Sequence, residues 1–193
     1  EYSELDNEDF VKNDNKRCFY CRDELSNKLI EFASSLDIDI IVDGTQSDDM
    51  GDYRPGIDAL HQNGIHSPLL ETNFTKNMVR NTAESIGLSI YDKPSNSCLA
   101  SRIPWGQRVT AEKLARIEMG EKIIKQKTGL RQVRVRDIDG KARIEVETDK
   151  IHLITENQIK SEISTKLKMI GFSHVEIDPE GYASGKLNIV YEN

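Results

Sequence analysis

Residues 131–147, RQVRVRDIDGKARIEVE, constrain the fold of this chain more than any other stretch. Apolar and charged residues alternate on both sides of the pair Asp139-Gly140, and a period of two places successive side chains on opposite faces of a β-strand. An Asp-Gly pair between two such runs is typical of a tight hairpin turn. The stretch therefore predicts a β-hairpin with one apolar face for the core and one charged face that carries Arg134 and Arg136.

Helices and further strands are expected on both sides of this hairpin. Thr110 can cap a helix that reaches about Lys127 and ends at Gly129. A second helix is expected over 157–170, and the segments SHVEIDP and KLNIVY favour two more strands. We therefore expect residues 106–193 to form a small α+β domain.

Residues 1–105 show a different pattern, in which short apolar runs alternate with helices. A helix is expected over 23–36, followed by the strand IDIIVDGT over 38–45. SPLL is expected to be a second strand, and a helix then begins at Thr75 and ends before Gly87. Because strands joined by helices of this length favour a parallel sheet, and only two strands are found, this part predicts an incomplete parallel sheet.

The composition limits where such a protein works and what it binds. The 193 residues carry a formal net charge of −7, and an acidic surface disfavours a general nucleic-acid partner. No apolar run approaches the roughly 20 residues of a membrane span, and the first residues, EYSELDNEDFVKNDNK, lack the basic and apolar regions of a signal peptide. We therefore expect a cytoplasmic protein without a membrane partner.

Three cysteines carry the first candidate chemistry: Cys18 and Cys21 in KRCFYCRDEL, and Cys98 in KPSNSCLASRIPWG. Three cysteines are few, and an odd number cannot all pair, so a disulfide framework is not expected. In a reducing compartment a spaced pair favours metal binding or catalysis. Arg102, four residues after Cys98, would favour the reactive thiolate. The alternative is that Cys98 is a small buried thiol without chemistry.

A group of acidic residues is a candidate for ligand binding. Asp43, Asp48, Asp49 and Asp52 lie at and beyond the end of the strand expected over 38–45. Open α/β sheets bind their ligands at this end of their strands. The alternative is a solvated acidic loop, since acidic residues are common in turns.

Arg134 and Arg136 form a second charged group, because they share one face of the first hairpin strand. At two-residue spacing they are separated by about 7 Å, which suits a phosphate or a carboxylate. The alternative is that they pair with Glu145 and Glu147 across the hairpin. The spacing therefore predicts either an anion site or a set of cross-strand ion pairs.

Several segments, in chain order, carry a resemblance to a known family. They are RCFYC, DGTQSDDMGDYRPG, SPLLE, TKNMVRNTAESIGL, DKPSNSCLASRIPWG, VTAEKLARIE, VRVRD and ARIEVE. Together they resemble the LarE family, the ATP-dependent pyridinium-3,5-biscarboxylic acid mononucleotide sulfurtransferases of the PP-loop pyrophosphatase superfamily. The resemblance covers about residues 17–147, and it implies an α/β fold with a partial PP-loop parallel sheet in residues 1–105 and a second, smaller α+β domain in 106–193.

The resemblance implies a sulfur-transfer reaction in the biosynthesis of the nickel-pincer cofactor of lactate racemase. In this family ATP adenylylates a substrate carboxylate, and a sulfur nucleophile then displaces AMP to leave a thiocarboxylate. The SGGxDS loop with which the family binds ATP does not occur in this sequence. We therefore expect the sequence to begin partway through the nucleotide-binding domain and to bind ATP weakly by itself.

The family also suggests a use for the three cysteines. Some members carry only the cysteine that matches Cys98 and give up its sulfur. Members with the three-cysteine pattern hold a [4Fe–4S] cluster through the positions that match Cys18, Cys21 and Cys98, and its open iron can bind an additional sulfide. Zinc is the alternative, because three thiolates and a water form an acceptable zinc site.

The same resemblance suggests roles for the charged candidates. Carboxylates of the second domain take part in catalysis or bind a divalent cation, Mg²⁺, in the family; Glu145 and Glu121 are the matches here. Glu118 shares a helix face with Glu121, and a solvated face or an arginine partner is the alternative for these carboxylates. The expected roles are catalysis by Cys98, Glu145 and Glu121, ATP binding by Asp43, Asp49 and Arg102, and substrate-phosphate binding by Arg134 and Arg136.

Two other functions fit parts of the sequence. An enzyme of the same superfamily that thiolates tRNA would keep the chemistry and change the substrate, but the acidic net charge disfavours it. A non-catalytic assembly and anion-binding module with structural zinc cysteines is the second alternative. The expected partners are a nucleotide-type small molecule, a sulfur donor that the sequence does not identify, and further copies of the chain in a homo-oligomer.

Overall fold

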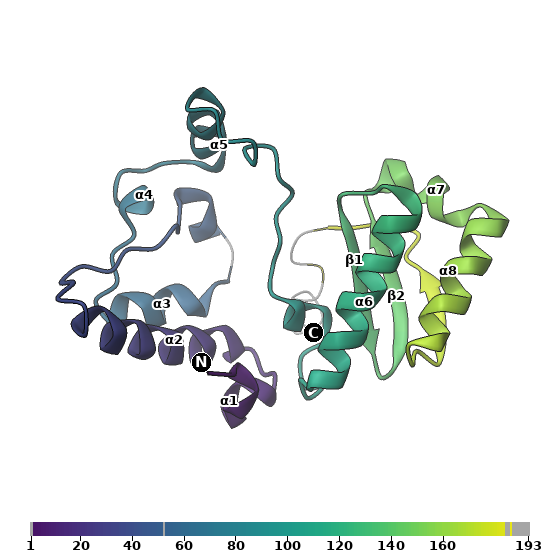
Figure 1. Cartoon of the computed structure of the whole chain (residues 1–193), viewed down its shortest axis with the longest axis horizontal. Coiled ribbons are helices and arrows are strands. Elements are labelled where there is room, and N and C mark those ends of the chain that lie inside the picture. The colour runs from purple at the N-terminus through teal and green to yellow at the C-terminus, as the bar shows by residue number, and fades with distance from the viewer. Residues whose placement is uncertain (1, 52, 184–185, 187–193) are drawn as a thin grey trace. The chain divides into compact units, whose positions relative to one another are not determined.

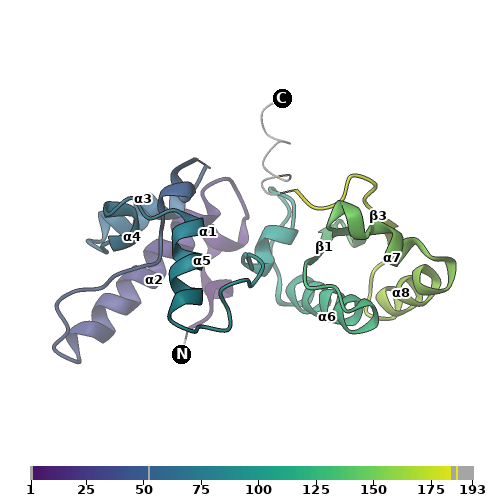
Figure 2. The same cartoon turned by 90° about the horizontal axis from the view of Figure 1, so that it is seen from above.

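A computed structural model describes residues 2–51, 53–183 and 186, and these residues form two compact units (Figures 1 and 2). The first unit comprises Glu1–Phe10 and Asp14–Lys93, and the second comprises Val11–Asn13 and Pro94–Asn193. Among the described residues, no helix is long and apolar enough to cross a membrane.

The described residues contain eight α-helices and one three-stranded sheet, a mixed α/β content. The helices are α1 (Glu8–Val11), α2 (Arg17–Ser34), α3 (Pro55–Gln62), α4 (Pro68–Glu71), α5 (Lys76–Ser85), α6 (Ala111–Thr128), α7 (Ile151–Thr155) and α8 (Asn157–Met169). The strands, all in the second unit, are β1 (Val133–Ile138), β2 (Lys141–Val146) and β3 (His174–Ile177).

The expected hairpin is confirmed in the second unit. β1 pairs with β2 in antiparallel register, with Val133 opposite Val146. Asp139 and Gly140 join the strands with φ of 48° and 78°, the positive values that a tight hairpin turn needs. β3 adds to β2 in parallel, so the sheet has the order β1-β2-β3.

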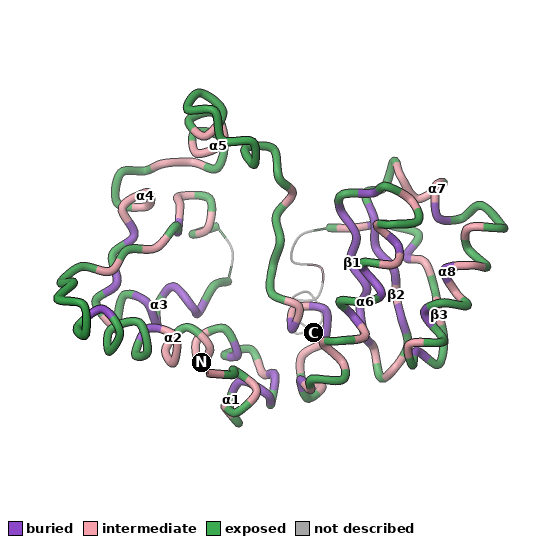
Figure 3. Tube along the Cα trace, in the orientation of Figure 1, coloured by how far each residue is buried: buried purple, intermediate pink, exposed green. Residues whose placement is uncertain are grey.

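Helices α6 and α8 cover one face of this sheet (Figure 2). As expected, Thr110 caps α6 by accepting a hydrogen bond from the N–H of Lys113 at 3.2 Å, and Gly129 ends it with a φ of 73°. Burial concentrates on β1 and β2 in Figure 3. The apolar core between sheet and helices contains Ile117, Ile124, Val133, Val135, Ile144, Val146, Ile154, Ile163 and Leu167.

The boundary between the two units lies earlier in the chain than the sequence pattern suggested. The domain division lies before Pro94, whereas the change in sequence pattern lies near residue 105. The reason is that hydrogen bonds connect the segment 94–102 to β1 and α6, among them that of Arg134 to the carbonyl of Ser95.

The strand expected for KLNIVY falls on Lys186 and residues 187–191, and residues 187–191 lie outside the described residues.

The first unit differs from the expected α/β pattern. The segment 38–45 is extended, but among the described residues it pairs only at Val42, in a parallel bridge with His66. The strand predicted for SPLL is wrong, because Pro68–Glu71 forms α4 with proline at its start, where its missing N–H costs nothing. The parallel sheet expected here is therefore reduced, in the described part of the chain, to one bridge.

Helices α2 and α3 pack on each other in this unit. α2 begins at Arg17 rather than at residue 23, and so it carries both cysteines of the CxxC pair. α3, which the sequence pattern did not predict, approaches α2 closely at Gly56: a Cβ built there would lie 3.0 Å from the carbonyl oxygen of Cys18. Only a glycine permits this approach without a shift of one helix.

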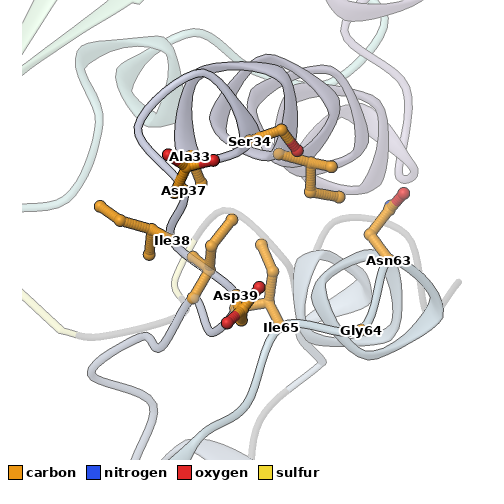
Figure 4. A pocket seen from close by; sticks show the side chains of 10 residues that line it. Ala33, Ser34, Asp37, Ile38, Asp39, Asn63, Gly64 and Ile65 are labelled. Atoms are coloured by element: carbon orange, nitrogen blue, oxygen red, sulfur yellow. The ribbon is translucent and has the colours of Figure 1, made fainter.

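Apolar side chains of the first unit remain open to solvent. Ile38, Ile40 and Val42 are at least half exposed on the extended segment. A hollow of about 450 Å³ lies between the end of α2, this segment and Ile65. Figure 4 shows the side chains that line it. Isoleucine side chains form much of its lining, and among the described residues Asp37 and Asp39 are the charged ones that line it.

Candidate functional site

Cys98 lies exposed in a tight turn of the second unit, immediately before a short 3₁₀ helix, Leu99–Arg102. Its carbonyl oxygen accepts hydrogen bonds from the N–H of Ser101 at 3.0 Å, from the Ser101 hydroxyl at 2.7 Å and from Arg102 Nη1 at 3.0 Å. The thiol is free. The turn therefore presents an accessible cysteine whose carbonyl oxygen accepts three hydrogen bonds, and the alternative of a buried thiol is wrong.

The side chain of Arg102 stabilises this turn through hydrogen bonds. Its side chain is fully buried, and Nη1 also donates to the carbonyl and the hydroxyl of Ser97, at 2.9 and 2.8 Å. Its Nε donates to Glu121 Oε1 at 2.9 Å, which ties the turn to α6. The guanidinium thus acts on the backbone around Cys98, and ATP binding by Arg102 stays a prediction.

Glu121 connects the turn to the sheet. Besides the bond from Arg102, Oε1 accepts the backbone N–H of Val135 at 3.3 Å, on the edge of β1 that does not face β2. Glu121 is only 5% exposed, whereas Glu118, three residues earlier on α6, is exposed. The two carboxylates therefore differ in environment, although their spacing suggested a shared face.

Arg136 and Glu145 form a two-pronged ion pair across the hairpin. Arg136 Nε lies 3.0 Å from Glu145 Oε1, and Nη2 lies 2.6 Å from Oε2. Both side chains are buried, and Nη1 of Arg136 donates to the carbonyl of Ser101 at 2.8 Å. The ion-pair alternative is therefore the arrangement observed for Arg136. The charged face of the hairpin exists as expected, but the segment before and around Leu99–Arg102 contacts it.

Arg134 has no carboxylate partner among the described residues. It donates to the carbonyls of Val133, at 2.9 Å, and of Ser95, and its guanidinium lies 5.4 Å from the centre of the Tyr182 ring. Burial lowers the pKa of Arg134, and the nearby positive charge of Arg102 lowers it further. Within the described part of the chain, Arg134 is thus a buried cation that forms no ion pair.

Six of the predicted site residues therefore lie close together in the second unit: Cys98, Arg102, Glu121, Arg134, Arg136 and Glu145. Their charged groups comprise three guanidinium groups and two carboxylates, so one positive charge is not balanced within the group. Such a group attracts an anion to its surface.

Sequence reasoning missed several residues that build this site. The Asn13 side chain is fully buried and donates to the carbonyls of Pro104 and Gln107, both at 2.8 Å, which holds the end of the CLASRIPWG segment. Ser97 and Ser101 bind Arg102, and their positions one residue before and three residues after Cys98 were a signal that could have been used. No sequence signal pointed to Asn13, because it is distant in the chain.

The remaining cysteines lie in the first unit. Cys18 and Cys21 are three positions apart on α2, a spacing that places both on one side of a helix. Neither cysteine forms a disulfide within the described residues; Cys18 is exposed and Cys21 is half-buried. Among the described residues, no group of three or more His, Cys, Asp or Glu side chains is gathered for a metal ion. A cluster or zinc at the three cysteines, and Mg²⁺ at the carboxylates, stay predictions.

The acidic loop of the first unit is held by its own hydrogen bonds. Asp43 accepts from the hydroxyls of Ser67, at 2.6 Å, and of Thr45. Asp49 pairs with Arg54 at 2.8 Å, and Asp48 accepts the N–H of Lys76 at 2.6 Å. These contacts give the carboxylates of the loop partners within the chain. Nucleotide binding by Asp43 and Asp49 stays a prediction. Asp52 lies outside the described residues.

Comparison with known proteins relates this arrangement to three curated sequences, although no family model matches the chain. The uncharacterized protein slr1717 of Synechocystis is 39% identical over 97% of the chain, and the uncharacterized protein MJ0830 of Methanocaldococcus jannaschii is 32% identical over 90%. The pyridinium-3,5-bisthiocarboxylic acid mononucleotide synthase of Lactiplantibacillus plantarum is 30% identical over 94% of the chain.

The chain spans about two thirds of the length of these relatives: 70% of slr1717, 65% of the synthase and 67% of MJ0830. The matches run through both units and thus include the Cys98 turn and the charged residues around it. The chain therefore belongs to the protein family of slr1717 and MJ0830, and a homologue at 30% identity is named as a pyridinium-3,5-bisthiocarboxylic acid mononucleotide synthase.

Proposed function

We propose that this chain is part of an ATP-dependent sulfurtransferase that converts a carboxylate of a pyridinium mononucleotide into a thiocarboxylate, a step in nickel-pincer cofactor biosynthesis. The observation that carries the proposal is the exposed Cys98 in a turn held by the buried Arg102, beside a group with excess positive charge. The similarity to the Lactiplantibacillus plantarum synthase supports the choice of substrate.

The reaction that we propose has two chemical stages. The substrate carboxylate attacks the α-phosphorus of ATP, which forms an acyl adenylate and releases pyrophosphate. A hydrosulfide ion then attacks the acyl carbon, the bond to the adenylate oxygen breaks, AMP leaves with the electron pair of that bond, and the proton of the hydrosulfide passes to solvent. The products are a thiocarboxylate, AMP and pyrophosphate.

In this proposal the second unit positions the sulfur and the anionic substrate. Arg102 and Glu121 fix the backbone of the turn that carries Cys98, which favours a defined position for the sulfur bound there. Arg134 supplies the charge that Glu121 and Glu145 do not balance, and its forked guanidinium suits a phosphate or carboxylate. Glu145 orients Arg136.

We further propose that Cys18, Cys21 and Cys98 hold a [4Fe–4S] cluster. The donor set suits such a group, because thiolates are the ligands of iron–sulfur clusters, none of the three cysteines forms a disulfide within the described residues, and two of them are spaced for one side of a helix. When bound by three thiolates, the cluster leaves one iron open to an additional sulfide. Zinc at the same residues is the alternative, and metal analysis distinguishes the two.

The proposal is tested with the purified whole protein of which this chain is part, together with ATP, sulfide and pyridinium-3,5-biscarboxylic acid mononucleotide. We expect release of AMP and formation of a thiocarboxylate, detected by mass spectrometry, only when ATP and the mononucleotide are both present. A parallel reaction with tRNA tests the related thiolation function. Thiolated tRNA without thiocarboxylate would overturn the choice of substrate, and the absence of both products would overturn sulfur transfer itself.

A further inference from the structure

Tyr182 lies against Arg134 and has no role in the function proposed above. The centre of its ring is 5.4 Å from the guanidinium carbon of Arg134, within the roughly 6 Å at which an aromatic face attracts a cation. Tyr182 is half-buried, whereas Arg134 is only 2% exposed. The ring therefore covers part of a charge that is withdrawn from water.

A tight turn places Tyr182 beside the sheet. Gly181 has a φ of 75°, which other residues rarely adopt, and a Cβ built there would lie 2.7 Å from the carbonyl oxygen of Val146. The N–H of Tyr182 donates to that same carbonyl at 2.8 Å. The hydroxyl of Thr148 donates to the carbonyl of Glu180 at 3.0 Å. The backbone that carries the ring is thus held against the end of β2.

The partners of Arg134 within the described residues are neutral. Its guanidinium donates to two backbone carbonyls, and the tyrosine ring carries no net charge. Buried arginines commonly pair with a carboxylate, which cancels their charge, as Arg136 does here with Glu145. Carbonyls and an aromatic face instead stabilise the guanidinium of Arg134 and leave its charge in place.

This difference accounts for the excess positive charge around the Cys98 turn. Arg102 and Arg136 each pair with a buried carboxylate, whereas Arg134 forms no ion pair in the described part of the chain. The unbalanced charge is therefore that of Arg134. In the low dielectric of a protein interior a charge acts over several ångströms, so it attracts an anion at the surface of the group without touching it.

We propose that Tyr182 is a positioning residue of the substrate site: its ring holds the guanidinium of Arg134 in place without neutralising it, and so preserves the attraction for an anionic substrate. The inference deepens the proposed function and rests on it for the identity of the anion. The ring face carries this role rather than the hydroxyl, because the contact with Arg134 is made through the ring.

Calorimetric titration of the whole protein with pyridinium-3,5-biscarboxylic acid mononucleotide tests the inference. Tyr182→Phe keeps the ring and should retain the natural affinity, whereas Tyr182→Leu should bind about five-fold more weakly. Tyr182→Glu offers Arg134 a counter-ion and should bind about ten-fold more weakly than the neutral Tyr182→Gln, which has a side chain of the same size. Equal affinity of the glutamate and glutamine variants, or natural affinity in Tyr182→Leu, would overturn the inference.

A second measurement needs no substrate. In urea unfolding followed by the fluorescence of Trp105, Tyr182→Leu should reduce the folding equilibrium constant about five-fold more in the natural chain than in an Arg134→Met background, because the ring then has no cation to contact. An equal loss in both backgrounds would overturn the contact.

The two failures are distinguishable. A natural protein that binds no mononucleotide would overturn the proposed function. A natural protein that binds it and forms thiocarboxylate, while Tyr182→Glu and Tyr182→Gln bind it equally, would overturn the role of Tyr182 alone.

Discussion

At the scale of single residues, Arg102 decides the geometry around Cys98. Arginine is rarely buried without partners, because removing a charge from water costs far more than one hydrogen bond returns. Here Arg102 meets Glu121, two serine hydroxyls and two backbone carbonyls. The sequence predicted Arg102, Cys98 and Glu121 as site residues. It did not predict that the guanidinium of Arg102 would bind the turn around Cys98 rather than a ligand. That choice depends on packing between distant segments.

Replacing Arg102 should therefore destabilise the second unit strongly. Arg102→Met leaves the buried Glu121 carboxylate with only the Val135 N–H and the more distant ammonium of Lys125, 3.9 Å away, and we expect a loss of about 3–5 kcal/mol in the free energy of unfolding. Urea unfolding followed by the fluorescence of Trp105, the only tryptophan, measures it. Lys122→Met, at an exposed position of α6, should change little. A loss below about 1 kcal/mol for Arg102→Met would mean that Glu121 is not held by this pair.

A second residue prediction concerns pH. Burial alone would raise the pKa of Asp178, but hydrogen bonds from Lys186 and from the backbone N–H of Glu180 outweigh it and lower that pKa. The group therefore stabilises the fold fully above its unfolded pKa, about 3.9, and this contribution is lost as the pH falls through the lowered pKa of the folded state.

We expect Asp178→Asn to be less stable than the natural protein at pH 7, and the difference in unfolding free energy to shrink as the pH falls below about 4. Urea titrations at a series of pH values measure this difference. A difference that is independent of pH would show that the Asp178 charge has no role.

At the scale of elements, the parts with local signals were predictable. Thr75 and Thr110 cap their helices as expected, and the Asp139-Gly140 turn closes the hairpin, because caps and turns are decided by neighbouring residues. SPLL was not predictable in the same way. A run of four residues is too short for its periodicity to separate helix from strand, and Pro68 at its start suited a helix.

The contact between α2 and α3 gives a test at this scale. Gly56→Ala places a methyl group 2.9 Å from Arg22 Cγ and 3.0 Å from the Cys18 carbonyl oxygen, so one helix must move. We expect a loss of about 1–3 kcal/mol in the stability of the first unit, seen as an earlier loss of helical circular dichroism in urea. Gly51→Ala, where nothing lies within 4 Å, is the control. Equal behaviour of the two variants would contradict the close helix contact.

At the scale of the whole molecule, the candidate chemistry is divided between two units. The CxxC pair lies in the first and Cys98 in the second, while the charged group around Cys98 lies wholly in the second. The sequence predicted two parts of different character. It did not predict that the segment 94–105 belongs with the second part, because this follows from the bonds of Arg102, Arg134 and Asn13 to residues far away in the chain.

If one cluster takes thiolates from both units, each cysteine should be needed for it. After anaerobic reconstitution we expect about four iron and four sulfide per chain, with broad absorption in the visible range. Cys18→Ser, Cys21→Ser and Cys98→Ser should each lower iron content, whereas the exposed Ser89→Ala should not. Zinc in place of iron in the purified protein would favour the zinc alternative, and full iron loading of all three cysteine variants would contradict the shared site.

The central claim is that Cys98 is required for the transfer of sulfur to the activated substrate. It is tested most directly by following both stages of the reaction in Cys98→Ser. With ATP and the pyridinium mononucleotide, we expect this variant to release pyrophosphate as the natural protein does, because activation of the carboxylate does not need the thiol. We expect it to form no thiocarboxylate, as measured by mass spectrometry of the nucleotide product. Thiocarboxylate formed by Cys98→Ser at the rate of the natural protein would contradict the claim.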